Sequence, residues 1–138
     1  MSKVIRFGVS LEKALLDHFD GRIRKNGYAN RSEAIRDLIR EDLVKVEWQE
    51  GKEVAGAITL VYDHHKRDLL NRLMDIQHDH HGSIMSSSHI HLDHHNCLEV
   101  VVTRGAPADV KDLFEKLKAL KGIKHVSMAM STMGKNVV

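Results

Sequence analysis

Residues 84–103 read IMSSSHIHLDHHNCLEVVVT, two strand-forming segments separated by a short polar turn. Side chains alternate between the two faces of a strand, so His89 and His91 share one face. A hairpin loop over residues 93–95 sets His91 directly opposite Cys97, where paired Cβ atoms are about 5 Å apart. The hairpin therefore predicts two imidazoles and one thiol on a single patch of a sheet.

The segments on either side of this hairpin continue an alternation of strands and helices. Hydrophobic periodicity predicts strands at 54–62, 84–92, 98–103 and 125–130, and helices at 66–77 and 108–120. The resulting order, βαββαβ, is typical of the split βαβ or ferredoxin-like fold, an antiparallel sheet with two helices on one face. We expect residues 51–138 to form this domain, after a linker at 48–51.

The first part of the chain, residues 1–50, has a different pattern and is predicted to be a separate domain. Residues 3–11 alternate between apolar and polar side chains, as in a half-buried strand. A helix is predicted over about residues 12–25, with Gly27 beyond its end. A second helix begins after Asn30, whose side chain can cap it. The whole chain is therefore predicted to be of the α+β class.

A strand without a partner in its own chain, followed by two helices, looks like one half of a ribbon-helix-helix DNA-binding domain. Two copies would pair their strands, and such a β-ribbon fits the DNA major groove. On its outer face Arg6 can bond guanine bidentately, Ser10 can donate or accept, and Gly8 has no side chain to read a base. The start of the second helix, with Arg31 and Ser32, is expected to bind phosphate. The alternative is a dimerisation strand beside an ordinary helix cap.

Bulk composition limits the partners and the location. The net charge is only +2, from 21 Lys and Arg against 19 Asp and Glu, so contacts to nucleic acid must come from local placement of charge. A single cysteine excludes a disulfide within the chain, and no stretch approaches the roughly 20 apolar residues that span a bilayer. Because no secretory signal pattern is present at the start, we expect a cytoplasmic protein. Two small domains also imply oligomerisation, since each alone would hide too little surface.

Histidine is unusually abundant: eleven are present, and nine of them lie between His64 and His95. Interior histidines interspersed with strand-forming residues favour metal binding over an affinity tag. A fourth ligand beside the hairpin is expected from the end of the preceding helix, at His78, His80 or His81. Spacing does not choose among these three, nor between donation from the same chain and from another. A set of three His and one Cys suits Zn²⁺, Cu²⁺, Co²⁺ or Ni²⁺.

Five short motifs spread along the chain are more specific. They are NRSEAIRD at 30–37, KRD at 66–68, QH at 77–78, HIH at 89–91 and CLE at 97–99. Together they resemble the nickel-responsive transcriptional regulator family, and the resemblance extends over almost the whole chain. The resemblance implies a square-planar Ni²⁺ site in which a helix end donates one ligand across a tetramer interface. The implied ligands are His89, His91, Cys97 and, in trans, His78.

The same resemblance implies an assembly and a role. The family forms a homotetramer, with a central core of ferredoxin-like, ACT-like domains and two flanking ribbon-helix-helix dimers. Nickel loading enables operator binding and repression of nickel-uptake genes. A K⁺ ion is implied near Glu33 and Asp37, and an additional metal position at His64. Gly8 departs from the small hydroxyl residue common on the reading strand, which points to different operator contacts.

Two other functions are compatible with a metal site. A metal-dependent hydrolase would keep one coordination position open beside a general base, and four protein ligands argue against that arrangement. A metal buffer or chaperone without DNA binding would suit loose histidine clusters, but the strand that carries Arg6 and Ser10 argues against it. These arguments favour a metal-dependent regulator over an enzyme, and the family resemblance implies that the metal is nickel.

Overall fold

The computed structural model describes residues 3–138 and divides the chain into two compact units, Met1–Ile39 and Arg40–Val138. The boundary between the units lies within the long helix α2 (Arg31–Glu50). Within residues 3–138, no helix is long and apolar enough to cross a membrane.

The first unit contains α1 (Lys13–Asn26) and the beginning of α2. Helix α1 ends at Gly27, which has a φ of 73° and donates its N–H to the carbonyls of the last turn, so the predicted glycine cap is confirmed. Asn30 accepts the backbone N–H of Glu33 at 2.9 Å, which confirms the predicted cap of α2. The Glu33 side chain pairs with Arg36 and does not return to the cap.

The segment before α1 differs from its prediction. Residues 3–11 form no strand in the structure, although a strand was expected there. A strand requires a neighbour that accepts and donates its ladder hydrogen bonds, and nothing within residues 3–138 pairs with this segment. Its apolar side chains are largely exposed; Phe7 is 71% and Val9 is 64% accessible. The alternating pattern is present, but nothing in the described part of the chain covers its apolar side chains.

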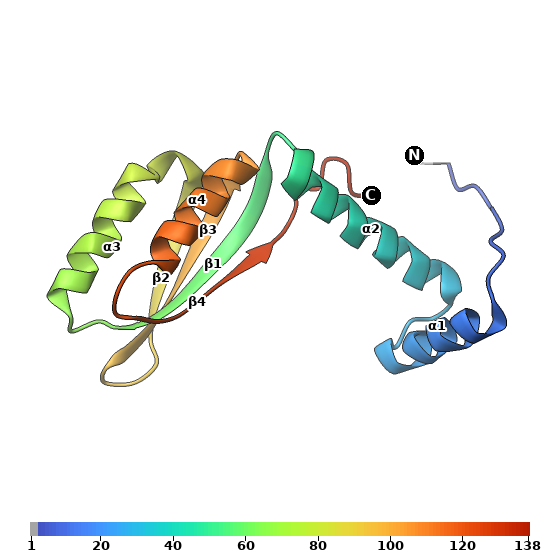
Figure 1. Ribbon diagram of the computed structural model, residues 1–138, viewed down its shortest axis with the longest axis horizontal. Helices are drawn as coiled ribbons and strands as arrows, with labels where there is room; N and C mark the ends of the chain where they lie inside the picture. Colours follow the sequence, from blue (N-terminus) through green and yellow to red (C-terminus); the bar gives the residue numbers. More distant parts are fainter. Residues whose placement is uncertain (1–2) are drawn as a thin grey trace. The chain divides into compact units, whose positions relative to one another are not determined.

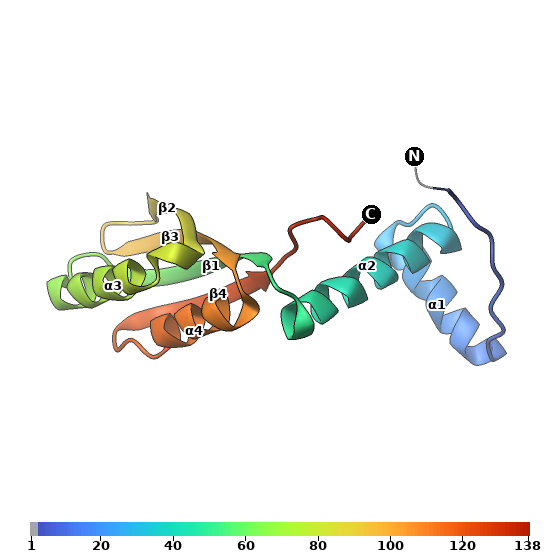
Figure 2. The same cartoon turned by 90° about the horizontal axis from the view of Figure 1, so that it is seen from above.

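The second unit has the predicted βαββαβ order. Its elements are β1 (Val54–Asp63), α3 (Arg67–Asp79), β2 (Ile84–His91), β3 (Asn96–Gly105), α4 (Pro107–Lys118) and β4 (Ile123–Met130), with a 3-10 turn, η1 (His81–Ser83), before β2. The four strands form one antiparallel sheet in the order β2-β3-β1-β4. Helices α3 and α4 lie side by side on one face of this sheet (Figures 1 and 2). The ferredoxin-like prediction is therefore confirmed.

The core of the second unit lies between the sheet and these two helices. Alternate residues of β1 are buried and the others are partly exposed, as expected for a strand with one covered face. The largest buried cluster combines this face with the apolar stripes of α3 and α4; its members are Ile58, Leu60, Tyr62, Leu69, Leu73, Cys97, Val101, Leu113 and Leu117.

Trp48 at the end of α2 belongs to this packed unit. Its indole is 2% exposed, packs with Val54 and Val110, and donates its N–H to the carbonyl of Ser131 at 2.8 Å. The stretch 48–51 was expected to be a linker, and this expectation is wrong for Trp48. A flexible linker would expose so large an aromatic side chain, whereas here it fills one end of the core.

The central position of Leu113 makes a test of this core possible. Its side chain is fully buried, so Leu113→Ala removes apolar contact and leaves a cavity, at a cost of about 2–5 kcal/mol of unfolding free energy. The exposed Glu115→Ala variant on the same helix should change stability by about 0.5 kcal/mol or less. Urea unfolding of the full chain in chelator, followed by circular dichroism, measures both. Equal effects of the two variants would contradict the assignment of this helix face to the core.

Candidate metal centre and nucleic-acid interface

The β2–β3 hairpin has the predicted register. His91 pairs with Cys97, and His89 pairs with Glu99. The Leu92 N–H donates to the Asn96 carbonyl at 2.9 Å, which closes the expected three-residue loop. Because Cys97 and Glu99 are buried on the face covered by the helices, their cross-strand partners carry two imidazoles to the edge of that face.

His89 makes contacts through both ring nitrogens. Its Nε2 lies 2.5 Å from Glu99 Oε1. Its Nδ1 lies 3.7 Å from Cys97 Sγ and 3.3 Å from the hydroxyl of Tyr62. Because a carboxylate can only accept, the proton is assigned to Nε2, and the lone pair on Nδ1 faces the thiol. This tautomer is the one that can ligate a metal through Nδ1 beside sulfur.

Glu99 is a carboxyl group buried in the core. Burial raises the pKa of Glu99, whereas the charge of His89 and a hydrogen bond from Gln77 act in the opposite direction. The amide of Gln77 donates to Glu99 Oε2 at 2.9 Å, so each carboxylate oxygen has a donor. Burial, followed by the negative charge of Glu99, raises the pKa of Tyr62, so its phenol stays protonated and can donate to His89.

His91 and His64 form a second pair of rings beside this network. Their ring centroids are 4.5 Å apart and the planes differ by 4°, so the imidazoles are stacked. The Nε2 atom of His64 is buried and has no hydrogen-bond partner within residues 3–138. A buried nitrogen without a partner is costly in a protein interior, and a metal ion or water satisfies such an atom.

The histidines at the end of α3 are not equivalent. Both ring nitrogens of His80 have partners, the Ile76 carbonyl at 2.8 Å and Asp112 at 2.9 Å. His81 contacts the backbone carbonyl of His78 at 3.0 Å. The exposed ring of His78 lies 6.0 Å from that of His81 and has no hydrogen bond to the described residues. Of the three candidates left open by the sequence, His78 therefore has a free imidazole, while that of His80 is engaged.

The four predicted nickel ligands are thus only partly assembled within one chain. The structure brings His89 and Cys97 together and sets His91 opposite Cys97. It does not place His78 within contact of these three. A different group is assembled: among residues 3–138, Asp63, His65 and His95 alone form a set of three potential ligands whose donor atoms lie within 4.8 Å of one another.

The predicted DNA-binding residues of the strand are accessible. Arg6, Gly8 and Ser10 lie in the exposed segment 3–11. At the start of α2, Ser32 is exposed, as expected for a phosphate contact.

Arg31, beside Ser32, already has a partner. Its guanidinium makes two hydrogen bonds of 2.9 Å to Asp20 of α1, and this interaction lowers the pKa of the Asp20 carboxyl. In this structure Arg31 therefore joins the two helices and is not a free cation.

The two carboxylates expected near a K⁺ ion lie one turn apart on α2. Glu33 pairs with Arg36, and Asp37 accepts the hydroxyl of Tyr28 at 2.8 Å. Both carboxylates therefore have protein partners in the first unit.

Sequence reasoning assigned no role to three residues of the inner network, Tyr62, Gln77 and Glu99. One signal for Glu99 was present, because the hairpin register that sets His91 opposite Cys97 also sets His89 opposite Glu99. No comparable signal existed for Tyr62 or Gln77, since their contacts depend on how β1 and α3 pack against the hairpin.

Comparisons with known proteins cover nearly the full chain. Residues 5–46 match the family model described as "Ribbon-helix-helix protein, copG family", and residues 55–131 match "NikR C terminal nickel binding domain". A relative from Syntrophus aciditrophicus, named as a nickel-responsive regulator, is 58% identical and covers 97% of this chain and 98% of its own. A relative of the same description from Nitratidesulfovibrio vulgaris is 54% identical and covers 99% of each chain.

Two solved structures are similar to part of the chain. An uncharacterized protein from Thermotoga maritima superimposes with a TM-score of 0.52 at 12% identity, covering 57% of this chain and 98% of its own. The ACT domain from GTP pyrophosphokinase of Chlorobium tepidum has a TM-score of 0.48 at 14% identity, covering 56% and 99%. At such identities the first likeness indicates the fold alone.

The two family models and the relatives agree with each other and with the fold. They confirm the α+β class, the N-terminal ribbon-helix-helix domain and the prediction that the chain is a regulator and not an enzyme. The chain belongs to the family of nickel-responsive regulators.

Proposed function

We propose that this protein is a cytoplasmic transcriptional regulator that binds operator DNA when loaded with Ni²⁺ and represses genes for nickel uptake. The proposal rests above all on His89, whose Nδ1 faces the buried sulfur of Cys97 at 3.7 Å while its Nε2 is held by Glu99. An imidazole fixed in this tautomer beside a thiol is suited to a borderline divalent ion.

The proposed ligands are His89, His91 and Cys97 of one chain and His78 of a second copy. The first three lie near the loop end of the β2–β3 hairpin, and the free, exposed ring of His78 is available to another subunit. A bound Ni²⁺ would supply a positive centre that holds these donors together. On metal binding, the His91 ring would either separate from the His64 ring or move together with it. The Tyr62 hydroxyl would no longer hydrogen-bond to Nδ1 of His89, because that lone pair would bind the ion.

The proposed DNA-binding domain comprises residues 1–50, and the metal-binding and tetramerisation domain residues 51–138. Exposed apolar side chains along residues 3–11 support pairing with the same segment of a second copy. That pairing would supply the backbone hydrogen bonds of a strand and bury the apolar side chains. The outer face would then present Arg6 and Ser10 to the major groove. In the proposed homotetramer, two such ribbons flank a core of four metal-binding domains.

Metal and DNA binding are coupled in this proposal by a population shift. Because His78 comes from a second copy, an ion favours only those arrangements of subunits that bring His78 to the hairpin. Those arrangements would also hold the two ribbons so that both reach DNA. Carboxylates at Glu33 and Asp37 are proposed to bind K⁺, and His64 is proposed as an additional metal ligand.

The central test compares DNA binding with and without metal. In mobility-shift assays on a pool of genomic promoter fragments, Ni²⁺ should strengthen binding of the wild-type protein by about 5- to 150-fold. Cys97→Ala should abolish this gain and the sulfur-to-nickel absorption band, because the thiolate is lost. His125→Ala, which removes an exposed histidine of β4, should retain both. Equal binding of the wild-type protein in chelator would refute nickel dependence, and no DNA binding in either condition would favour a metal buffer.

Glu99 provides a test of how the imidazole is prepared. Glu99→Gln keeps the shape but offers His89 a weaker acceptor, so nickel affinity should fall by about 10- to 100-fold. The stability of the metal-free protein should be unchanged or higher, because a buried carboxylate is removed. Titration with Ni²⁺ and urea unfolding in chelator separate the two effects, with exposed Glu115→Gln as control. A parallel loss of stability would mean that Glu99 serves only the fold.

Arg6 provides a test of base reading. Arg6→Ala should weaken binding of the nickel-loaded protein to its preferred site by about 1–3 kcal/mol and relax preference at one base pair. Arg6→Lys should restore the salt dependence but only part of the preference, because lysine keeps the charge without the planar pair of donors. Competition binding with single-base variants of the site measures the preference. An unchanged preference in Arg6→Ala would remove this residue from base reading.

A further inference from the structure

Asp63, His65 and His95 form the one group of three potential metal ligands that is already assembled in the described part of the chain. One carboxylate oxygen and one ring nitrogen of each histidine lie within 4.8 Å of one another. Asp63 ends β1, His65 lies in the turn before α3, and His95 lies in the β2–β3 loop. None of the three is among the proposed nickel ligands.

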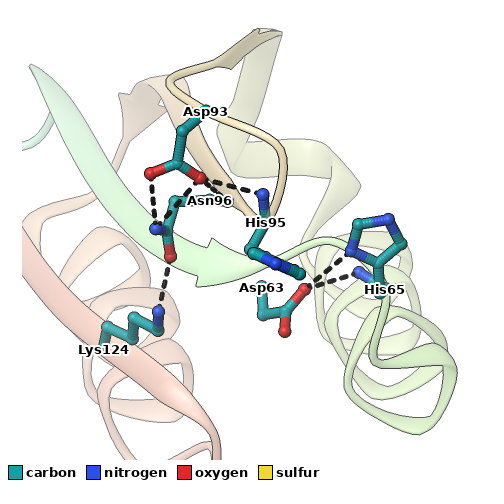
Figure 3. Close-up of polar contacts among 6 residues, drawn as sticks. All are labelled: Asp63, His65, Asp93, His95, Asn96 and Lys124. Carbon is teal, nitrogen blue, oxygen red and sulfur yellow. Dashed lines mark hydrogen bonds and ion pairs between the residues drawn. The ribbon is translucent and has the colours of Figure 1, made fainter.

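The backbone holds the three segments in place independently of these side chains. Asp63 pairs in register with Asn96 at the end of the β1–β3 ladder. The N–H of His64 donates to the carbonyl of His95 at 3.2 Å, so the turn and the loop are joined directly. In Figure 3 the rings of His65 and His95 both approach the Asp63 carboxylate from their separate segments.

The loop that carries His95 is also stabilised internally. Asp93 accepts the N–H of His95 at 2.8 Å and that of Asn96 at 2.7 Å, and it accepts the Asn96 side-chain amide as well. Asn96 in turn accepts a hydrogen bond from Lys124 of β4 (Figure 3). The hydrogen bonds from Asn96 and His95 lower the pKa of Asp93 to about 2. The position of His95 is therefore determined by a fixed loop and not by a mobile tip.

We propose that Asp63, His65 and His95 bind a second divalent transition-metal ion, of the Zn²⁺, Ni²⁺ and Cu²⁺ class. Two imidazoles and one carboxylate match the nitrogen and oxygen donors that these ions take, and three protein ligands leave positions for water. Donor atoms of a tetrahedral site lie roughly 3.4 Å apart, so small side-chain rotations of the exposed His65 and His95 rings close the set.

This site is weaker than the proposed nickel site. His65 and His95 are exposed to solvent, and no thiolate takes part. In the metal-free protein the Asp63 carboxylate already accepts from the His65 backbone N–H at 2.9 Å, with the His65 Nδ1 at 3.2 Å. The ion must compete with this contact.

An ion at this second site would connect to the hairpin through His64. The centroid of the His64 ring is 4.2 Å from that of His65 and 4.5 Å from that of His91. Binding would cross-link the turn after β1, which contains His64, to the loop between β2 and β3, which begins directly after His91. The proposal itself stands on the cluster alone and does not depend on nickel regulation of DNA binding.

Calorimetric titration of the full chain with Ni²⁺ tests the site. The wild-type protein should show two steps, a tight one and a weaker one. His95→Ala and Asp63→Asn should lose the weaker step and keep the tight one, which also shows that they fold. Cys97→Ala should lose the tight step and keep the weaker one. His94→Ala, which removes the neighbouring loop histidine outside the cluster, should keep both.

Two results would overturn the second site. One is a weaker step that persists in both His95→Ala and Asp63→Asn. The other is a weaker step lost equally in His94→Ala, which would assign it to general histidine content in the loop. A wild-type protein that lacks the tight step but retains a weaker step sensitive to His95→Ala would instead refute the nickel site and support this one.

Discussion

The antiparallel register of β2 on β3 is the constraint on which the rest of the candidate site depends. It sets His91 opposite Cys97 and His89 opposite Glu99, and both partners on β3 are buried under the helices. Because side chains alternate with a period of two, a slip of one residue would turn both histidines to the open face of the sheet. The same slip would separate His89 from its carboxylate. The register is fixed against that slip by the three-residue loop, which is closed by the hydrogen bond from Leu92 to Asn96. The Asp93 carboxylate also accepts the backbone N–H of Asn96 at the other end of the loop.

Glu99 is hard to explain by stability alone. A buried carboxylate costs several kcal/mol of desolvation, and an apolar side chain of similar volume at such a position is often neutral or stabilising. The neighbouring positions on the same face of β3, Cys97 and Val101, are indeed apolar. What the carboxylate provides is directional: it accepts from His89 Nε2 and thereby directs the Nδ1 lone pair toward sulfur. The desolvation cost of burying Glu99 is thus offset by a fixed orientation of the His89 ring, with Nδ1 directed at the sulfur.

Local patterns in the sequence predicted those features that depend only on neighbouring residues. The hairpin register follows from loop length, and the ends of α1 and α2 follow from Gly27 and Asn30, whose roles require only neighbouring backbone. Features that depend on distant packing could not be predicted in this way. Trp48 becomes a core residue because β1 and α4 come to lie against it, and His95 meets Asp63 only after two loops are brought together by β1–β3 pairing. Spacing along one chain is equally unable to decide whether the proposed ligand His78 would come from the same subunit or from another.

Two parts of the chain are incomplete for the same physical reason. Residues 3–11 have strand-like alternation with exposed apolar side chains and no ladder partner within residues 3–138, and His78 has a free imidazole away from the other proposed ligands. In the proposed assembly a second copy would satisfy both, the first by strand pairing and the second by a shared ion. If both are satisfied at once, metal affinity and DNA affinity become properties of the assembly. An ion that bridges subunits then needs no path through the interior of one chain to influence DNA binding, because it acts directly on how the chains are arranged.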